Sequence, residues 1–153
     1  MRIEILRHGD AVPHRLVGGA DPHRHLSELG RQQARAAGAF LSREAGEPGL
    51  IWTSPLTRAV QTAELVAASR GATAVVESKP VLAFGGCDEV LEAVSVDAAP
   101  AAVLLVGHLP VLGDLLRVLT GSPSLPDPSP GEAFVLEGAP APGGCKLVAE
   151  HRG

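Results

Sequence analysis

Aromatic side chains are scarce in this chain of 153 residues, which contains three Phe, one Trp and no Tyr. Proteins that bind single-stranded nucleic acid stack bases on aromatic rings, and this sequence offers few rings for that purpose. A formal net charge of −4 also argues against a nucleic-acid partner, because phosphate backbones are held by clustered Lys and Arg. The acidic balance still permits a local basic pocket for one phosphate group.

Cysteine and long apolar stretches are scarce as well. Cys87 and Cys145 are too few for a disulfide framework and form no CxxC motif, which predicts free thiols in a reducing cytoplasm. The first residues lack the apolar region of a signal peptide. Polar residues and proline interrupt the most apolar stretch, 98–119, as in a buried strand followed by a helix. We expect a soluble, cytoplasmic protein without a membrane partner, and the sequence leaves its oligomeric state open.

The motifs of nucleotide and metal sites are missing. The sequence contains neither G-x-x-x-x-G-K-[ST] nor G-x-G-x-x-G, so no nucleotide site is expected. His23 and His25 alternate along an extended segment with no cluster of Cys or carboxylates, which argues against zinc. We interpret the charged and His side chains of the loop at 12–25 as solvated. The prediction is an enzyme or binding protein with no metal and no cofactor.

Strand and helix patterns alternate along the chain and predict one α/β domain covering residues 1–153. Strands are expected at 3–6, 50–53, 74–82 and 101–106, with a closing pair at 132–138 and 145–150. Helices are expected at 27–44, after the strand 50–53, at 88–96, and from Pro110 onward. In the second helix, Ser54 would be the N-cap and Pro55 the first helical residue.

Three polar segments directly follow predicted strands. Arg7-His8-Gly9 follows the first strand, Ser54 to Arg58 follows the second, and Gly107-His108 follows the strand at 101–106. Ligand sites of open α/β sheets form outside the carboxyl ends of the strands, so parallel strands would bring two His and two Arg to one edge. The sequence therefore predicts a phosphate site that contains a nucleophile.

The chemistry of these side chains supports that grouping. A neutral imidazole nitrogen can attack phosphorus and form a covalent phosphohistidine, which divides hydrolysis into two easier steps. The transition state spreads charge over three equatorial oxygens, and the planar fork of arginine suits them. Two Arg and a protonated second His would then supply the positive charge that a metal supplies in other phosphatases.

The motifs of the chain resemble those of the histidine phosphatase superfamily, the phosphoglycerate mutase-like proteins. Arg7-His8-Gly9 looks like the family's signature, and Leu26 to Ala34 is similar to its L-[ST]-x-x-G-x-x-x-A helix start. Ser54 to Thr62 resembles the segment S-P-x-x-R-A-x-Q-T, and Gly107-His108 resembles the second catalytic histidine. The resemblance implies a three-layer α/β/α fold with a mostly parallel central sheet.

Within that family, Arg7 to Ala11 and Gly107 to Gly113 are similar to the short SixA-type phosphohistidine phosphatases. The resemblance implies that His8 is the nucleophile, that Arg7 and Arg58 bind the phosphoryl group, and that His108 is the second histidine of the pocket.

The segment before the third predicted helix departs from the SixA-type pattern E-L-x-P-x-G-D. It has Val81 where the pattern has Glu, and its acidic residue is shifted by one position. Only Asp88 and Glu89 are then available nearby as a general acid, and both would also fit as exposed residues that begin a helix. An alkoxide needs a proton donor to leave, whereas imidazole, with a pKa of about 6.5, leaves far more easily.

Three functions follow from these observations. The first is a metal-independent phosphatase that hydrolyses phosphohistidine on a protein partner through a covalent intermediate on His8. The second is a phosphomonoesterase that acts on a small phosphorylated metabolite, with Asp88 or Glu89 as the general acid. The third is a non-catalytic phosphate-binding regulator that retains the pocket.

Overall fold

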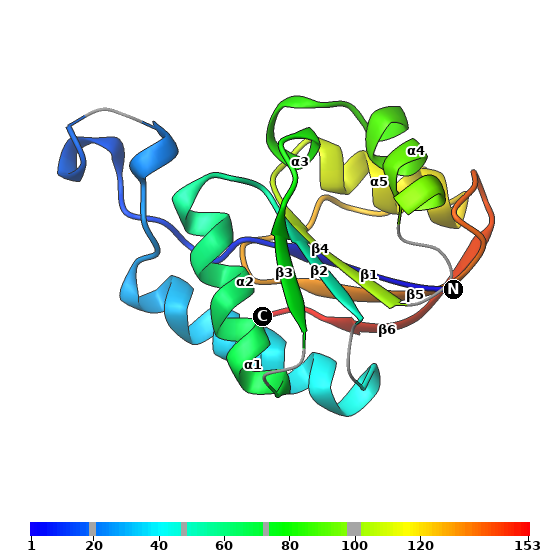
Figure 1. Ribbon diagram of the computed structural model, residues 1–153, viewed down its shortest axis with the longest axis horizontal. Coiled ribbons are helices and arrows are strands. Elements are labelled where there is room, and N and C mark those ends of the chain that lie inside the picture. Colours follow the sequence, from blue (N-terminus) through cyan, green and yellow to red (C-terminus); the bar gives the residue numbers. More distant parts are fainter. Residues whose placement is uncertain (19–20, 47–48, 72–73, 98–101) are drawn as a thin grey trace.

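A six-stranded sheet runs through the centre of the molecule (Figure 1). The computed structural model describes residues 1–18, 21–46, 49–71, 74–97 and 102–153. The strand order is β3-β2-β4-β1-β5-β6, with β1 at Arg2–Arg7, β2 at Leu50–Thr53, β3 at Val75–Ser78, β4 at Ala102–Gly107, β5 at Ala133–Gly138 and β6 at Cys145–His151. Strands β3, β2, β4 and β1 pair in parallel, whereas β5 is antiparallel to both β1 and β6. The predicted mostly parallel sheet and the closing strand pair are therefore confirmed.

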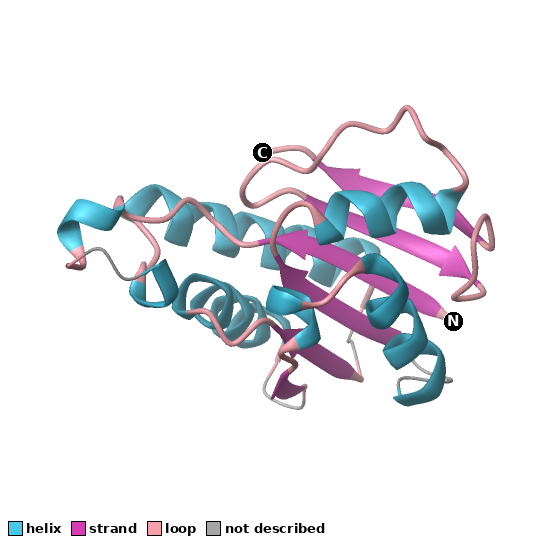
Figure 2. Ribbon diagram, turned by 90° about the horizontal axis from the view of Figure 1, so that it is seen from above, coloured by secondary structure: helices cyan, strands magenta, loops and turns pink. Residues whose placement is uncertain are grey.

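Helices cover both faces of the sheet (Figures 1 and 2). One face is covered by α1 (Glu28–Glu44) and α2 (Thr57–Arg70), and the other by α3 (Val81–Phe84), α4 (Cys87–Asp97) and α5 (Val111–Thr120). The segment between β1 and α1 projects from the body of the molecule and contains two 3-10 turns, His14–Leu16 and Asp21–His23. This arrangement confirms the three-layer α/β/α architecture. No helix among the described residues has the length and apolar character needed to span a bilayer.

The two cores that flank the sheet follow from the alternation of side chains along each strand. In β4, Val103 and Leu105 pack against α4 and α5, whereas Leu104 and Val106 pack against α1 and α2. All four are fully buried. A continuous apolar run with both faces covered is typical of a central parallel strand.

The register of the parallel strands brings three strand ends to one edge of the sheet. Arg7 of β1 pairs with Gly107 of β4, and Thr53 of β2 pairs with Val106 of β4. The next amides continue the ladder, because His8 N–H donates to Gly107 O at 3.1 Å and Ser54 N–H donates to Val106 O at 2.9 Å. Three segments of the predicted site thus leave the sheet side by side.

Two element boundaries differ from the sequence prediction. Helix α2 begins at Thr57 with Leu56 as its N-cap, so Ser54 and Pro55 precede the helix. The expected strand at 74–82 ends at Ser78, because Pro80 cannot donate to the sheet and instead precedes the short helix α3, which contains Leu82. Residue 101 of the expected strand 101–106 lies outside the described residues.

Candidate active site

A polar cavity of about 260 Å³ lies where the three strand ends meet. The four side chains that the sequence singled out as nucleophile, second histidine and phosphate ligands all line it. Its lining residues are Arg7, His8, Asp10, Ala11, Arg24, Arg58, His108, Leu109 and Pro130. The topology therefore brings together two imidazoles and three guanidiniums in one small space.

His8 is arranged as a neutral ring with one unprotonated nitrogen. Its Nδ1 lies 2.7 Å from Gly9 O, and because a carbonyl can only accept, Nδ1 carries the proton. Burial, together with the charges of Arg58 and Arg7, lowers the pKa of His8 to about 4, against the opposing effect of the bond to Gly9. Nε2 thus bears the lone pair near neutral pH, and the Nε–H of Arg58 donates to it at 3.3 Å.

Arg58 is held by the projecting segment as well as by its own helix. It lies in the first turn of α2 and is 7% exposed. Its Nη1 donates to Asp21 O at 3.0 Å and its Nη2 to Asp21 Oδ2 at 3.2 Å. Burial acts to raise the pKa of Asp21, but Arg58 and Arg24 outweigh that effect and lower it. The guanidinium of Arg58 is therefore paired with a carboxylate of the projecting segment.

Arg7 approaches the cavity from the end of β1. Its Nη1 donates to Pro128 O at 3.0 Å, while its buried Nε has no hydrogen-bond partner within the described ranges. Burial lowers the pKa of Arg7, and Asp127 opposes that shift. A guanidinium remains charged at any working pH, so Arg7 retains donors for a phosphoryl oxygen.

His108 follows β4 and lies beside His8, with their ring centroids 4.9 Å apart. Its Nε2 is 2.6 Å from Ser54 Oγ, and its buried Nδ1 has no hydrogen-bond partner in the part of the chain that the structure describes. Burial, together with the neighbouring His8 and Arg58, lowers the pKa of His108 to about 3. A pKa this low makes His108 neutral near pH 7, where the sequence predicted a protonated ring, because a cluster that already holds guanidinium charges disfavours another cation.

Hydrogen bonds from hydroxyl and amide groups hold the loop that carries His8 in place. Gly9 N–H donates to Thr62 Oγ1 at 3.1 Å, and that hydroxyl donates to Arg58 O at 2.8 Å. A methyl group at Gly9 would lie 2.4 Å from the carbonyl oxygen of Gly30 in α1, so only glycine fits this crossing. The backbone next to His8 and the backbone of Arg58 are thus held by one hydroxyl, that of Thr62.

Several residues of the site were not identified from the sequence. Asp10 lines the cavity and accepts from Ser27 Oγ at 2.5 Å, and its place directly after the Arg-His-Gly motif was the available signal. Asp21 and Arg24 belong to the loop that was interpreted as solvated, yet Arg24 lines the cavity and Asp21 binds Arg58. No local pattern marks Asp21, because the fold alone brings it to α2.

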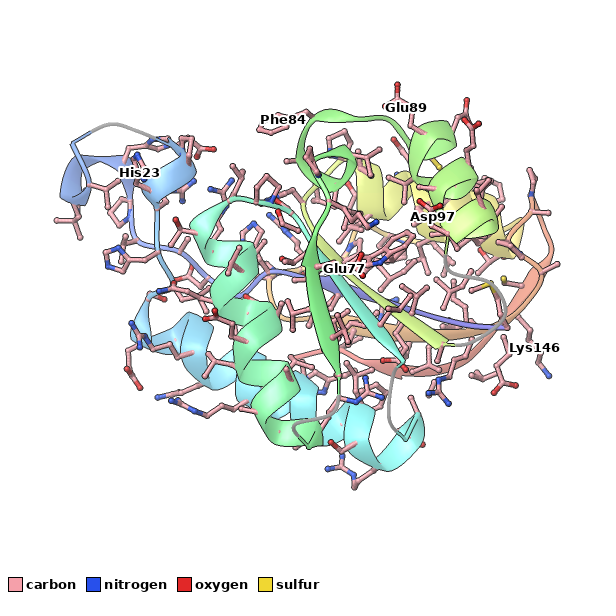
Figure 3. The ribbon with its side chains drawn as sticks, in the orientation of Figure 1. His23, Glu77, Phe84, Glu89, Asp97 and Lys146 are labelled. Atoms are coloured by element: carbon pink, nitrogen blue, oxygen red, sulfur yellow. The ribbon has the colours of Figure 1, made fainter. Side chains whose placement is uncertain are left out.

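Asp88 and Glu89 are not brought to the cavity. Glu89 Oε2 accepts from Gly86 N–H at 3.0 Å, which caps the start of α4. Figure 3 shows Glu89 on the outer side of α4, near Phe84 and far from the projecting segment that carries His23. Asp88 is exposed and lines a different hollow with Asp114 and Arg117. The geometry supports the structural interpretation of both residues, in the first turn of a helix.

The cavity is built to hold a tetrahedral anion against an imidazole lone pair. It offers guanidinium donors, a second imidazole and one nucleophilic nitrogen. Within the described segments, no three His, Cys, Asp or Glu side chains gather into a group that could hold a metal ion. Arginine is the side chain best matched to phosphoryl oxygens.

Comparison with known proteins agrees with this geometry. Residues 3–82 match the sequence profile of the histidine phosphatase superfamily (branch 1). The chain is 31% identical over 123 residues to phosphohistidine phosphatase SixA of Escherichia coli (strain K12), which covers 78% of this chain and 74% of that protein. It is 29% identical over 133 residues to the phosphohistidine phosphatase SixA homolog of Haemophilus influenzae, which covers 79% of this chain and 78% of that protein.

The fold is also similar to a solved structure of the protein histidine phosphatase SixA complexed with tungstate. The TM-score is 0.86 at 25% sequence identity, and the match covers 99% of this chain and 97% of that one. The strand-end cavity, the profile match and the curated relatives all lead to one assignment. The chain belongs to the histidine phosphatase superfamily, branch 1.

Proposed function

We propose that this phosphatase hydrolyses phosphohistidine on a protein partner through a covalent phosphohistidine intermediate on His8. The observation that carries the proposal is the state of the His8 ring. The contact with Gly9 O places its proton on Nδ1, and burial with nearby guanidiniums keeps its pKa low. Nε2 therefore has a lone pair ready for attack without prior removal of a proton.

In the first step, Nε2 of His8 attacks phosphorus and the bond between phosphorus and the partner's imidazole nitrogen breaks. The electron pair of that bond returns to the partner's ring. When the other nitrogen of that ring carries a proton, the leaving group is neutral imidazole, so no carboxylic acid is needed. His8 keeps its own proton on Nδ1, bonded to Gly9 O.

In the second step, water attacks phosphorus and the bond to Nε2 breaks. The electron pair returns to Nε2, which restores the neutral ring, and the proton of the water leaves with the phosphate product and solvent. Because His8 keeps its Nδ1 proton throughout, both steps use the same tautomer. Arg7, Arg58 and His108 stabilise the charge that develops on the three equatorial phosphoryl oxygens.

The distribution of carboxylates favours phosphohistidine over an alkyl phosphate. An alkyl phosphate needs a proton donor for its alkoxide, and Asp88 and Glu89 lie outside the cavity. Asp10 lines the cavity, but its Oδ2 accepts the hydrogen of Ser27 Oγ at 2.5 Å. Among the described residues, the carboxylate of the cavity is thus placed as an acceptor in the contact that it makes. The name of the Escherichia coli relative, a phosphohistidine phosphatase, supports the same substrate class.

The test compares two substrates on the wild-type protein. We expect a histidine-phosphorylated protein domain to be hydrolysed at least about 100-fold faster than glycerol phosphate, in line with the 10²–10⁴-fold contribution of general acid catalysis that the second substrate lacks. Equal rates, or a faster reaction with glycerol phosphate, would overturn the phosphohistidine assignment in favour of the metabolite phosphatase.

The covalent step is tested by rapid quenching after mixing with a ³²P-labelled phosphohistidine protein. We expect an acid-labile label on the wild-type chain that forms and decays during turnover. His8→Ala should abolish both label and turnover, whereas the matched change His14→Ala in the projecting segment should not. Circular dichroism checks that each variant is folded. Turnover by His8→Ala, or a label that never decays, would overturn the mechanism, and the second result would indicate a phosphate-binding regulator.

A further inference from the structure

We propose that Ser54 is a positioning residue that holds the proton of His108 on Nδ1, so that His108 donates a hydrogen bond to the phosphoryl group. The inference rests on the proposed function for its catalytic consequence. Its structural part depends only on the contacts of two buried side chains. Ser54 leaves the sheet beside His108 because β2 and β4 are neighbours, and it is fully buried there.

The hydrogen bonds around Ser54 determine which way its hydroxyl points. Ser54 Oγ accepts from the Leu56 N–H at 3.1 Å. The hydroxyl has one hydrogen of its own, and a buried hydroxyl hydrogen requires an acceptor. His108 Nε2, at 2.6 Å, is the acceptor that the described residues provide. The hydroxyl therefore donates to Nε2, which must bear a lone pair.

The proton of a neutral His108 ring is then on Nδ1. A neutral imidazole carries one proton, and burial among His8 and the guanidiniums keeps the ring neutral. The opposite tautomer would leave two groups unsatisfied: the Ser54 hydroxyl hydrogen, and a lone pair on Nδ1. That lone pair would also repel the oxygens of a phosphoryl group. The tautomer with the proton on Nδ1 leaves a single donor unpaired.

That donor matches a second observation at the His108 ring. His108 Nδ1 is buried and has no hydrogen-bond partner among the described residues, although the ring lines the cavity next to His8. Buried polar groups are normally paired, so an orphan calls for a partner that arrives later. A phosphoryl oxygen supplies it. The donor is fixed before the substrate binds, which is how preorganised groups stabilise developing charge.

The two histidines thus share one tautomer and use opposite nitrogens. Gly9 O holds the proton of His8 on Nδ1, which leaves Nε2 free to attack phosphorus. Ser54 occupies Nε2 of His108, which leaves the Nδ1–H free to donate. A backbone carbonyl determines the tautomer of His8, and a serine hydroxyl determines the tautomer of His108. Ser54 can therefore be changed without altering the nucleophile.

The test measures the tautomer directly by NMR of the ¹⁵N-histidine-labelled protein, without substrate. His108 is assigned by comparison with His108→Gln. We expect His108 Nδ1 to be protonated and Nε2 to be unprotonated at pH 7. A proton on Nε2, or on both nitrogens, overturns the proposal. This measurement needs no Ser54 variant and no turnover, so its failure leaves the hydrolysis mechanism standing, and failure of the ³²P test leaves the tautomer standing.

The variants then link the tautomer to catalysis. In Ser54→Ala the proton of His108 should no longer be confined to Nδ1. The variant should lower kcat by about tenfold, less than the 10²–10³-fold loss that follows removal of a whole oxyanion donor. Labelling of His8 should persist. Ser54→Thr keeps the hydroxyl and should restore both tautomer and rate. The neighbouring buried hydroxyl of Thr53 donates to Ser54 O, and Thr53→Val should leave the His108 tautomer unchanged. An unchanged tautomer in folded Ser54→Ala overturns the role of Ser54.

Discussion

The Nε–H of Arg58 lies 3.3 Å from Nε2 of His8, so the guanidinium covers the lone pair proposed to attack phosphorus. The other two nitrogens of the same guanidinium are bonded to the carbonyl and the carboxylate of Asp21. A phosphoryl group therefore has to replace these acceptors with its own oxygens. In the proposed mechanism, the guanidinium of Arg58 then donates to phosphoryl oxygens in place of Asp21 and His8. The same change of partners uncovers the lone pair of His8.

That exchange requires the planar fork of arginine. We predict that Arg58→Lys lowers kcat/KM by about 10²–10³-fold, because a lysine cannot donate from three fixed nitrogens at this position. Steady-state kinetics with a phosphohistidine protein measures the loss. Arg43→Lys, at an exposed position of α1, is the matched control and should retain the wild-type rate. A loss of less than about fivefold in Arg58→Lys would show that one positive charge suffices.

The pH dependence of kcat/KM should reflect the buried state of His8. The attacking ring must be neutral, and burial with nearby guanidiniums lowers its pKa from 6.5 to about 4. Protonation therefore removes activity only as the pH falls toward about 4, and the free enzyme should stay active between pH 6.5 and pH 5. His108, with a pKa of about 3, titrates still lower.

The measurement is kcat/KM against pH, corrected for the titration and acid hydrolysis of the substrate itself. The acid limb of this profile belongs to the free enzyme. A limb centred near pH 6.5 after that correction would mean that the two imidazoles are hydrated like free histidine, and that the burial described for them does not exist in solution.

The positions of the site residues could be predicted because they follow strands that the sequence marks clearly. The apolar run of β4 ends at Gly107, and the register then places His8 and His108 next to each other. Rules based on neighbouring residues failed where a group from a distant part of the chain competes for the same side chain. Ser54 fits the rule for a helix N-cap, yet its hydroxyl lies 2.6 Å from His108 and the helix begins three residues later.

Two further properties depend on the assembled site and have no local signature. The neutral state of His108 arises from burial beside His8 and Arg58, which come from other parts of the chain. Asp21 reaches Arg58 across 37 positions of sequence from a segment without helical or strand periodicity. Charge balance inside the cavity is therefore a consequence of the fold and cannot be obtained from motif spacing.

The Asp21 carboxylate should weaken the binding of anions to the site. Asp21→Asn keeps an oxygen that accepts from Arg58 but removes a negative charge that is bonded to a guanidinium of the cavity. The Asp21 side chain is 44% exposed, so solvent screens the pair. Such pairs contribute about 0.2–1 kcal/mol, which corresponds to an increase of up to about fivefold in tungstate affinity.

Inhibition constants for tungstate at low and high salt measure this effect. The difference between Asp21→Asn and the wild type should shrink at high salt, because salt screens exposed charges. Asp97→Asn, at the end of α4, has the same change in net charge and should bind tungstate like the wild type. Weaker binding by Asp21→Asn would instead mean that the carboxylate is needed to hold Arg58 in place.

The two acidic residues of α4 should affect stability rather than catalysis. Glu89 accepts the Gly86 N–H at the start of the helix, so Glu89→Ala should lower the free energy of unfolding by about 1 kcal/mol or less, the usual effect of a lost cap. Asp88→Asn, in the same helical turn, should have a smaller effect. Urea denaturation measures both. Neither variant should change the hydrolysis of phosphohistidine or of glycerol phosphate at 25 °C. A tenfold or larger loss confined to glycerol phosphate would identify that residue as a general acid and require the helix to move toward the cavity during turnover.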